Sequence, residues 1–288
     1  MKFSVTSYSF AGLTGSEKKQ EIELIALAKK LGFDGIEFAE IHPPAGENKL
    51  SYANRLRQEA ARVGIPIVAY CVGADLLNDF DREISRLKTE ADVACALGAP
   101  LMRHDASGGY RKEIRRQRGF NEALPTLIDG YNAVTDYART RGVRTCIENH
   151  GFFAQDSSRV MAIVGGVADE NFGALVDIGN FLCADEDPAK AVGLLAPYAF
   201  HVHCKDFHVK PGTVLAPDRG FFTSRGGNYL RGAIVGHGDV PVLQCVRLLE
   251  NAGYEGYYTV EFEGMEDPIV GVEAGLRYLK QVERVLHG

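Results

Sequence analysis

The sequence has no excess of basic residues and no long stretch without charge. Lysine and arginine number 32 against 38 aspartates and glutamates, so the formal net charge is −6. This balance argues against a protein that binds nucleic acid through bulk charge. The longest stretches without a charged residue, 3–16 and 191–204, are too short to span a membrane.

Closely paired cysteines are also lacking. The six cysteines stand singly at positions 71, 95, 146, 183, 204 and 245. A chain of this length does not need disulfides for its stability, so we expect reduced thiols and a cytoplasmic location. The N-terminus has neither the basic start nor the continuous apolar stretch of a signal peptide. No low-complexity tract or charge block marks a linker, so we expect a single domain.

What the sequence does contain is a regular alternation of short β-rich runs and helical patterns. The expected strands are 3–8, 35–38, 65–71, 100–103, 143–147, 173–177, 199–203 and 257–262. The expected helices are 16–31, 50–63, 79–97, 120–141, 157–164, 188–195, 241–252 and 268–286. Alternation at this spacing predicts βαβ crossovers and a parallel sheet.

Eight such units predict an α/β fold of one domain, a closed (β/α)₈ TIM barrel. The alternative is an open doubly wound sheet, which calls for a glycine-rich turn after its first strand. Gly12 and Gly15 follow the first expected strand but lack the GxGxxG spacing, which favours the barrel. The segment 207–240 is longer than an ordinary βα loop, and we expect it to act as a lid or to select the substrate.

Ionisable side chains end the last four expected strands. They are Glu148, Asp177, His203 and Glu261. Because the active site of such a barrel lies at the C-terminal ends of its strands, these side chains should meet. Burying three carboxylates together is costly unless a cation neutralises them. We therefore expect one divalent metal ion bound by these four residues; the alternative is a structural ion-pair network.

This ligand set also bears on the identity of the ion. Three carboxylates and one imidazole form a hard, oxygen-rich site, which suits Mn²⁺ or Mg²⁺ and leaves Co²⁺, Fe²⁺ and Zn²⁺ open. Glu263 is the alternative ligand from the last strand, since residues two apart share a face. His201 is expected to be a core histidine, and Glu37 is left open as a residue that lines the pocket.

Sequence motifs around these residues point to a known family. The runs CIENHG, ALVDIGNF, FHVHCKD and YYTVEFEG occur in this order, with GFDGIEF near the start. Together they resemble the xylose-isomerase-like barrel superfamily, the sugar phosphate isomerase/epimerase group, over nearly the whole chain. That group includes ketose 3-epimerases, inosose dehydratase and endonuclease IV, and its barrels are often homodimers or homotetramers. The resemblance implies one Mn²⁺ or similar ion on Glu148, Asp177, His203 and Glu261, with Glu148 and Glu261 as the acid/base pair.

The implied reaction is proton transfer next to a sugar carbonyl, through an enediolate that the ion stabilises. Two bases on opposite faces of the substrate give an isomerase or epimerase, which is the leading hypothesis. The same machinery with a departing hydroxyl gives a lyase, either a keto-inositol-type dehydratase or a sugar-bond eliminase. An abasic-site endonuclease is disfavoured because Asn180 replaces a needed histidine and the net charge is negative. A non-catalytic sugar-binding barrel is disfavoured by the intact ligand set.

Five further polar residues are expected to bind the sugar substrate. They are His150, Asn180, Lys205, His104 and Arg231. Asn180 stands where ketose 3-epimerases usually have a histidine, and an amide can form hydrogen bonds but cannot carry a proton. His150 could compensate for it. Arginines of the segment 207–240 could bind a phosphate or a carboxylate.

Overall fold

Eight parallel strands close into a barrel in the computed structural model, which describes residues 1–14, 20–115 and 117–288. The strands are β1 (Lys2–Thr6), β2 (Gly35–Phe38), β3 (Ile67–Val72), β4 (Leu101–His104), β5 (Arg144–Glu148), β6 (Phe172–Asp177), β7 (Ala199–Cys204) and β11 (Tyr257–Val260). They pair in the order β1-β11-β7-β6-β5-β4-β3-β2. This closed parallel order confirms the expected (β/α)₈ barrel and excludes the open sheet.

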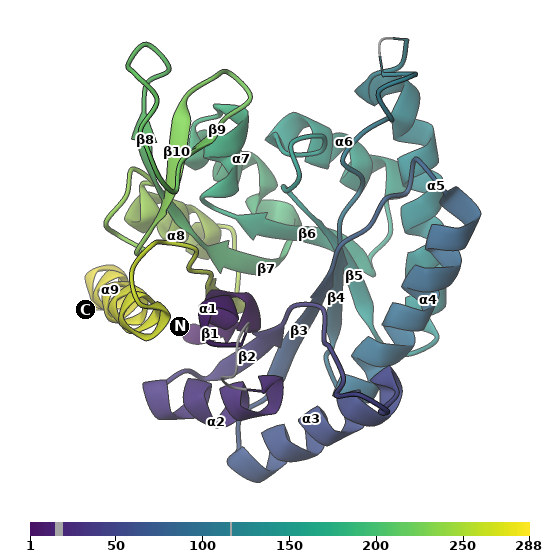
Figure 1. Cartoon of the computed structure of the whole chain (residues 1–288), viewed down its shortest axis with the longest axis horizontal. Coiled ribbons are helices and arrows are strands. Elements are labelled where there is room, and N and C mark those ends of the chain that lie inside the picture. The colour runs from purple at the N-terminus through teal and green to yellow at the C-terminus, as the bar shows by residue number, and fades with distance from the viewer. Residues whose placement is uncertain (15–19, 116) are drawn as a thin grey trace.

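Helices surround the barrel on its outside (Figure 1). They are α2 (Glu21–Leu31), α3 (Lys49–Val63), α4 (Phe80–Leu97), α5 (Phe120–Arg139), α6 (Ser157–Val167), α7 (Pro188–Leu195), α8 (Val242–Asn251) and α9 (Pro268–His287), with the short α1 (Ala11–Thr14) after β1. Gly64 and Gly98 follow α3 and α4 at φ 73° and 71°, a left-handed conformation that glycine adopts without strain. Gly15 and the expected start of the first helix at residue 16 lie outside the described residues.

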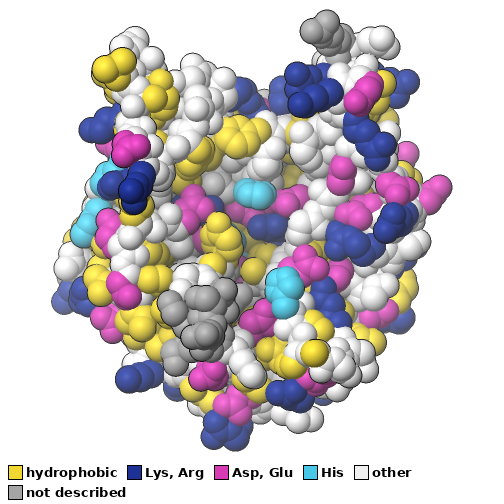
Figure 2. Space-filling model, in the orientation of Figure 1, with side chains coloured by type: hydrophobic (Ala, Val, Ile, Leu, Met, Phe, Trp, Pro, Cys, Tyr) yellow, Lys and Arg dark blue, Asp and Glu magenta, His cyan; other side chains and the backbone are white. Residues whose placement is uncertain are grey.

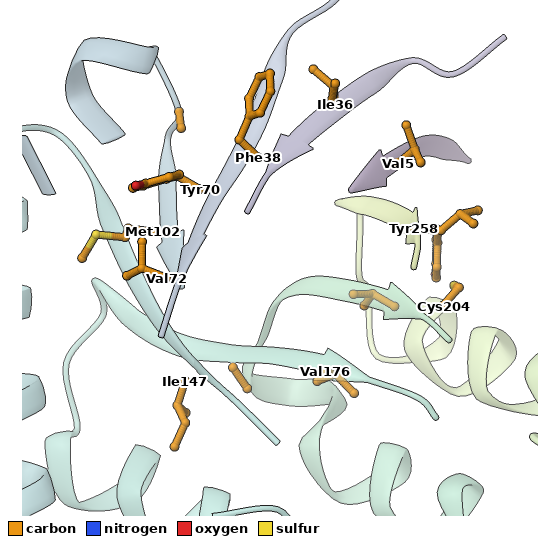
Figure 3. Close-up of a cluster of buried hydrophobic side chains, with 14 of the residues drawn as sticks. Val5, Ile36, Phe38, Tyr70, Val72, Met102, Ile147, Val176, Cys204 and Tyr258 are labelled. Carbon is orange, nitrogen blue, oxygen red and sulfur yellow. The ribbon is translucent and has the colours of Figure 1, made fainter. Parts of the chain in front are cut away.

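Most of the apolar core lies between the barrel and the helices. Ile36 and Phe38 of β2 point outward into this layer (Figure 3), where both are fully buried. Residues of the opposite parity point into the barrel, where a smaller cluster includes Cys71 and Cys146. Because successive side chains of a strand alternate between faces, one register decides which residues enter the barrel. Within the described residues, the apolar stretches of the helices are too short to cross a membrane.

The segment after β7 is not the irregular loop that the sequence suggested. It forms a small antiparallel sheet of β8 (Asp206–Lys210), β9 (Phe222–Thr223) and β10 (Tyr229–Ala233), in the order β8-β10-β9. The sheet projects from the rim of the barrel near α7 and α8 (Figure 1). Its strands are too short to give a clear alternation in the sequence.

Candidate metal centre and substrate cavity

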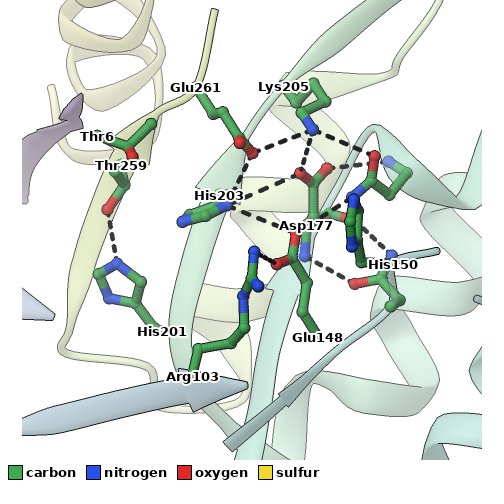
Figure 4. Close-up of polar contacts among 12 residues, drawn as sticks. Thr6, Arg103, Glu148, His150, Asp177, His201, His203, Lys205, Thr259 and Glu261 are labelled. Atoms are coloured by element: carbon green, nitrogen blue, oxygen red, sulfur yellow. Dashed lines mark hydrogen bonds and ion pairs between the residues drawn. The ribbon is translucent and has the colours of Figure 1, made fainter. Parts of the chain in front are cut away.

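Four side chains converge at the C-terminal end of the barrel (Figure 4). Glu148 and Asp177 end β5 and β6, His203 lies near the end of β7, and Glu261 directly follows β11. One ligand atom from each lies within 4.8 Å of the other three, and all four residues are buried. The structure therefore brings together the residues that were expected to hold a metal ion. Glu263, the alternative to Glu261, lies outside this group.

The donor atoms that face one another lack hydrogen bonds among the described residues. They are Glu148 Oε2, Asp177 Oδ2, His203 Nδ1 and Glu261 Oε2. The other carboxylate oxygen of Asp177 is satisfied, because it accepts the backbone N–H groups of Gly179 and Asn180 at 2.8 and 2.9 Å. These atoms lie instead in close ion pairs, such as His203 Nδ1 with Glu261 Oε2 at 2.8 Å, and three buried carboxylates around one point still call for a cation. An oxygen-rich set with one imidazole nitrogen fits a divalent cation such as Mg²⁺ or Mn²⁺.

Two buried cations lie beside these carboxylates. Arg103 Nη2 is 2.5 Å from Glu148 Oε2, and Lys205 Nζ is 3.1 Å from Glu261 Oε2 and 3.5 Å from Asp177 Oδ2. Lys205 was expected near the substrate, whereas the sequence interpretation missed Arg103. Its signal was an arginine inside a short apolar strand, a position that an unpaired charge rarely occupies.

Crowding of charge distributes the protons unevenly over the three carboxyl groups. Burial raises the pKa of Asp177 to about 7, and the charges of Glu261 and Glu148 add to the effect. Burial acts in the same direction on Glu261, but Lys205 and His203 outweigh it and hold its pKa well below the usual range. Without an ion, therefore, Asp177 is the carboxyl group that keeps a proton near neutral pH.

A second pair of contacts orients the imidazole of His203. Its Nε2 lies 3.0 and 2.9 Å from the two carboxylate oxygens of Glu37 on β2, so its Nδ1 faces the other carboxylates. Burial would lower the pKa of His203, but the charges of Glu37 and Glu261 outweigh it and raise the pKa well above its usual value. Glu37 also lies 2.9 Å from Nε2 of His201, which is buried inside the barrel. A carboxylate behind a ligating histidine is a common way to fix the ring and its tautomer.

Next to the four ligand atoms lies a cavity of about 350 Å³, within the range of small-molecule sites. Its wall consists of Thr6, Tyr8, Glu37, Ala39, Glu40, Cys71, Gly73, Arg103, Asp105, His150, His203, Lys205, Glu261 and Glu263. His150 is half-exposed there, and its Nδ1 lies 3.0 Å from Asp105 Oδ1. Figure 2 shows acidic, basic and histidine side chains together in the hollow of this face.

The five residues expected to bind substrate therefore separate into groups. His150 and Lys205 line the cavity. Asn180 does not line it but contacts the centre, with Nδ2 at 3.1 Å from Glu148 Oε1 and Oδ1 at 3.3 Å from Lys205 Nζ. Its role is to hold these two groups in place.

His104 and Arg231 lie outside the cavity, so both expectations need correction. His104 points away from the barrel interior and stacks on Tyr131 of α5, with 4.5 Å between ring centroids. Its neighbour Arg103 occupies the inward position, because alternate residues of β4 point to opposite faces. Arg231, on β10, lies with its guanidinium 5.5 Å from the ring centroid of Phe221.

Comparisons with known proteins agree with this fold. The family described as "Xylose isomerase-like TIM barrel" matches residues 25–282. An inosose dehydratase of Geobacillus thermodenitrificans is 24% identical over 263 residues, which is 88% of this chain and 83% of the relative. L-ribulose-5-phosphate 3-epimerase UlaE of Escherichia coli is 23% identical over 278 residues, 90% of this chain and 88% of that protein.

Other similarities are more partial or concern the fold alone. An inosose dehydratase of Clostridium perfringens is 27% identical over 153 residues, so the chain spans about half the length of this relative. A solved xylose isomerase-like TIM barrel protein from Mycobacterium smegmatis, in complex with magnesium, superimposes with a TM-score of 0.72 at 18% identity, over 98% of this chain and 96% of that one. The expected resemblance is thus confirmed, and the chain belongs to the xylose isomerase-like TIM barrel family.

Proposed function

We propose that this protein is a divalent-metal-dependent enzyme that moves a proton at a carbon next to the carbonyl of a sugar or sugar derivative, as an isomerase or epimerase. The observation that carries the proposal is the convergence of three buried carboxylates and one buried imidazole, with ligand atoms within 4.8 Å of one another, next to a cavity of about 350 Å³. The similarity to a protein named L-ribulose-5-phosphate 3-epimerase supports this reaction class.

Glu148, Asp177, His203 and Glu261 would hold the ion, and their oxygen-rich set favours Mn²⁺ or Mg²⁺. When bound, the ion would polarise a sugar carbonyl and stabilise the negative charge that develops on its oxygen. The protein's own part is to keep these donors deprotonated and oriented. Arg103 favours the anionic form of Glu148, and Glu37 orients the imidazole ring of His203.

Two glutamates are placed to exchange protons with the substrate. Glu261 lines the cavity and is kept anionic by Lys205 at 3.1 Å, so it is the group to which we assign proton removal. Glu148 approaches from β5, which β6 and β7 separate from β11 around the barrel. Epimerisation requires a proton carrier on each face of the substrate, so we assign to Glu148 the return of a proton, which it must first take up from water.

A lyase is the second candidate, and His150 is the observation that favours it. Loss of a hydroxyl next to the deprotonated carbon needs an acid in the cavity. His150 lines the cavity and is held by Asp105 at 3.0 Å, away from the four ligand atoms. Relatives named inosose dehydratase support this alternative.

The proposed partner is a small sugar molecule, not nucleic acid, since the net charge is −6. The proposed compartment is the cytoplasm, which the six free cysteines support.

The experiment that tests the function measures deuterium uptake from D₂O at the carbon next to the carbonyl. The metal-loaded protein is incubated with a panel of ketoses and with a keto-inositol, and products are identified by NMR. Glu148→Gln and Glu261→Gln should each lower the exchange rate at least about a hundredfold, because each removes a proton carrier. Glu273→Gln, at a partly exposed side chain of α9, is the control and should keep the full rate.

The product separates the two candidates, since only a lyase yields a dehydrated compound. Full exchange in either glutamine variant, or no exchange with any substrate in the panel, would contradict the proposed function.

A further inference from the structure

The cations that line the cavity in the described part of the chain are already paired with carboxylates. Arg103 binds Glu148 at 2.5 Å and Asp105 at 3.3 Å. His150 is bound to the same Asp105 at 3.0 Å. Arg103 cannot turn to a new anion without leaving the buried Glu148 unpaired, which is strongly unfavourable, and His150 would have to give up its contact with Asp105.

Lys205 is even more heavily committed. Its ammonium group lies 3.1 Å from Glu261, 3.5 Å from Asp177 and 3.8 Å from Glu263, and its side chain is buried. An ammonium group offers three donors, and here three carboxylates surround it together with the amide oxygen of Asn180 at 3.3 Å. A phosphate group would have to compete with these neighbours for the ammonium group of Lys205.

Negative charge is in excess on the wall of the cavity. The acidic residues there are Glu37, Glu40, Asp105, Glu261 and Glu263, against two permanent cations, Arg103 and Lys205, and two histidines, His150 and His203. Glu148 and Asp177 add two more carboxylates behind the wall, so one divalent ion offsets only these two. A phosphate dianion that entered this cavity would meet a negative field at short range in a partly desolvated site.

The usual cradle for phosphate in a barrel is also filled. TIM barrels often hold phosphate on backbone amides of the loops after the seventh and eighth strands. Here the carboxylate of Asp206, directly after β7, accepts the N–H groups of Phe207, Gly236, Gly238 and Val240, at 2.8 to 3.1 Å. The protein's own anion occupies the amides that would otherwise receive a phosphate.

The arginines of the segment 207–240 do not compensate. Arg225 binds Asp156 at 2.8 Å and the carbonyl oxygen of Phe152, and Arg231 lies against Phe221. Arg219 is exposed, and none of these three arginines lines the cavity.

We propose that the site takes an uncharged sugar or sugar derivative and rejects phosphorylated ones. The inference rests on the proposed function, whose site it concerns, but it comes from separate observations: the paired cations, the acidic wall and the filled amide cradle. It separates this chain from its relative named for a sugar phosphate, L-ribulose-5-phosphate 3-epimerase. A cavity of about 350 Å³ lies at the small end of ligand sites, which suits a substrate close to a single sugar in size.

The test compares matched pairs of substrates on the magnesium-loaded full chain. D-ribulose and D-ribulose 5-phosphate form one pair, and D-fructose and D-fructose 6-phosphate form another. We expect deuterium exchange with a kcat/KM at least about tenfold higher for the free sugar of a pair, because like charges oppose binding of the ester. Equal or faster exchange with the phosphate ester would overturn the inference and leave the proposed function intact.

A charge-reversal variant makes the comparison sharper. Glu263→Lys should lower the ratio of free to phosphorylated kcat/KM by about tenfold, since it removes one wall carboxylate and adds a cation. Glu273→Lys makes the same change at a partly exposed side chain of α9 and should leave the ratio unchanged. An unchanged ratio in Glu263→Lys would count against the electrostatic explanation.

Absence of exchange with every sugar would contradict the proposed function, and equilibrium binding would then decide the present inference. Calorimetric titration of the magnesium-loaded protein with D-ribulose 5-phosphate should show no saturable binding at millimolar concentration. Saturable binding of the ester with a Kd below about 1 mM, a typical affinity for an enzyme's own substrate, would refute it.

Discussion

Single residues at the centre hold the protons that an ion must displace. Burial and the neighbouring carboxylates raise the pKa of Asp177 to about 7. In His203, Nε2 lies 2.9 Å from the carboxylate of Glu37 and Nδ1 lies 2.8 Å from that of Glu261. Two carboxylates at these distances favour the doubly protonated imidazole ring. Both residues must lose a proton to act as ligands.

Metal affinity should therefore rise with pH. Between pH 6 and pH 7 the Kd of the metal-free protein for Mn²⁺ should fall by about tenfold for each proton released, because Asp177 is protonated below a pKa of about 7. Calorimetric titration in buffers of different ionisation enthalpy measures the number of protons released when the metal ion binds. Asp218→Asn, at an exposed position of the segment 207–240, is the control and should keep the same pH dependence. A Kd independent of pH over this range would contradict the assignment of Asp177 as a ligand.

Glu37 is expected to act through His203 and not on the ion. Glu37→Gln keeps the shape but weakens the two contacts to Nε2 of His203 at 2.9 and 3.0 Å. The Kd for Mn²⁺ should increase by about 10- to 100-fold, as is typical when the partner of a ligating histidine is lost. Competition with a chelating dye measures it.

Glu40→Gln is the matched control, because Glu40 lines the same cavity but pairs with Lys49 at 3.1 Å. An equal loss of affinity in both variants would show that overall charge, and not the orientation of His203, is responsible.

From the sequence we could predict the site residues at the ends of strands, but not those within strands whose side chains point into the barrel. Glu148, Asp177 and Glu261 each follow an apolar run, so their place at the rim follows from strand direction alone. Arg103 and Glu37 lie within strands, and their inward orientation depends on the register of the barrel. An error of one residue in that register exchanges Arg103 for His104, which is why His104 was wrongly expected in the cavity.

Among the elements, the loop before α8 is tied to the end of β7 by one side chain. The carboxylate of Asp206 accepts four backbone N–H groups, three of them from residues 236, 238 and 240. A Cβ at Gly238 would lie 2.2 Å from Asp206 Oδ1, so only glycine permits this approach. This network fixes the segment that follows the small sheet of β8, β9 and β10.

Asp206→Ala should lower the free energy of unfolding by about 2 kcal/mol or more, because buried amides lose their acceptor. Asp206→Asn should lose less, since its amide oxygen still accepts part of the network. Denaturant unfolding measures both variants, with the exposed Asp218→Ala from the same segment as control. An unfolding midpoint of Asp206→Ala equal to that of the wild type would contradict this role.

The alternation of strands and helices could be predicted because each unit repeats a strong local pattern, whereas the sheet of β8, β9 and β10 could not. Its pairing joins Lys210 to Tyr229 and Phe222 to Leu230, across chain segments that give no period of their own. Such strands form because the barrel rim holds their ends together. That this segment closes over the substrate stays a prediction.

For the whole molecule, the four proposed ligands would couple metal binding to folding. An ion that binds the folded chain stabilises it by about 2.7 kcal/mol at a concentration a hundredfold above its Kd. In the metal-free protein, the raised pKa of Asp177 contributes stability at low pH that is lost as pH rises from about 4 to about 7, since the folded chain holds the proton more tightly than the unfolded chain. Raising the pH thus lowers the free energy of unfolding of the metal-free protein and increases its affinity for the metal ion.

The increase in Tm on adding Mn²⁺ should therefore be larger at pH 8 than at pH 6, reaching about 5 °C at saturating ion. Differential scanning calorimetry with and without a chelator measures it. Asp177→Asn cannot titrate, so this variant should show a smaller increase with little dependence on pH, whereas the exposed Arg277→Gln on α9 should behave as the wild type. If the Tm of the wild type increased by the same amount at both pH values, the explanation would be wrong. The ion would then not stabilise the protein by reducing the repulsion among the buried carboxylates.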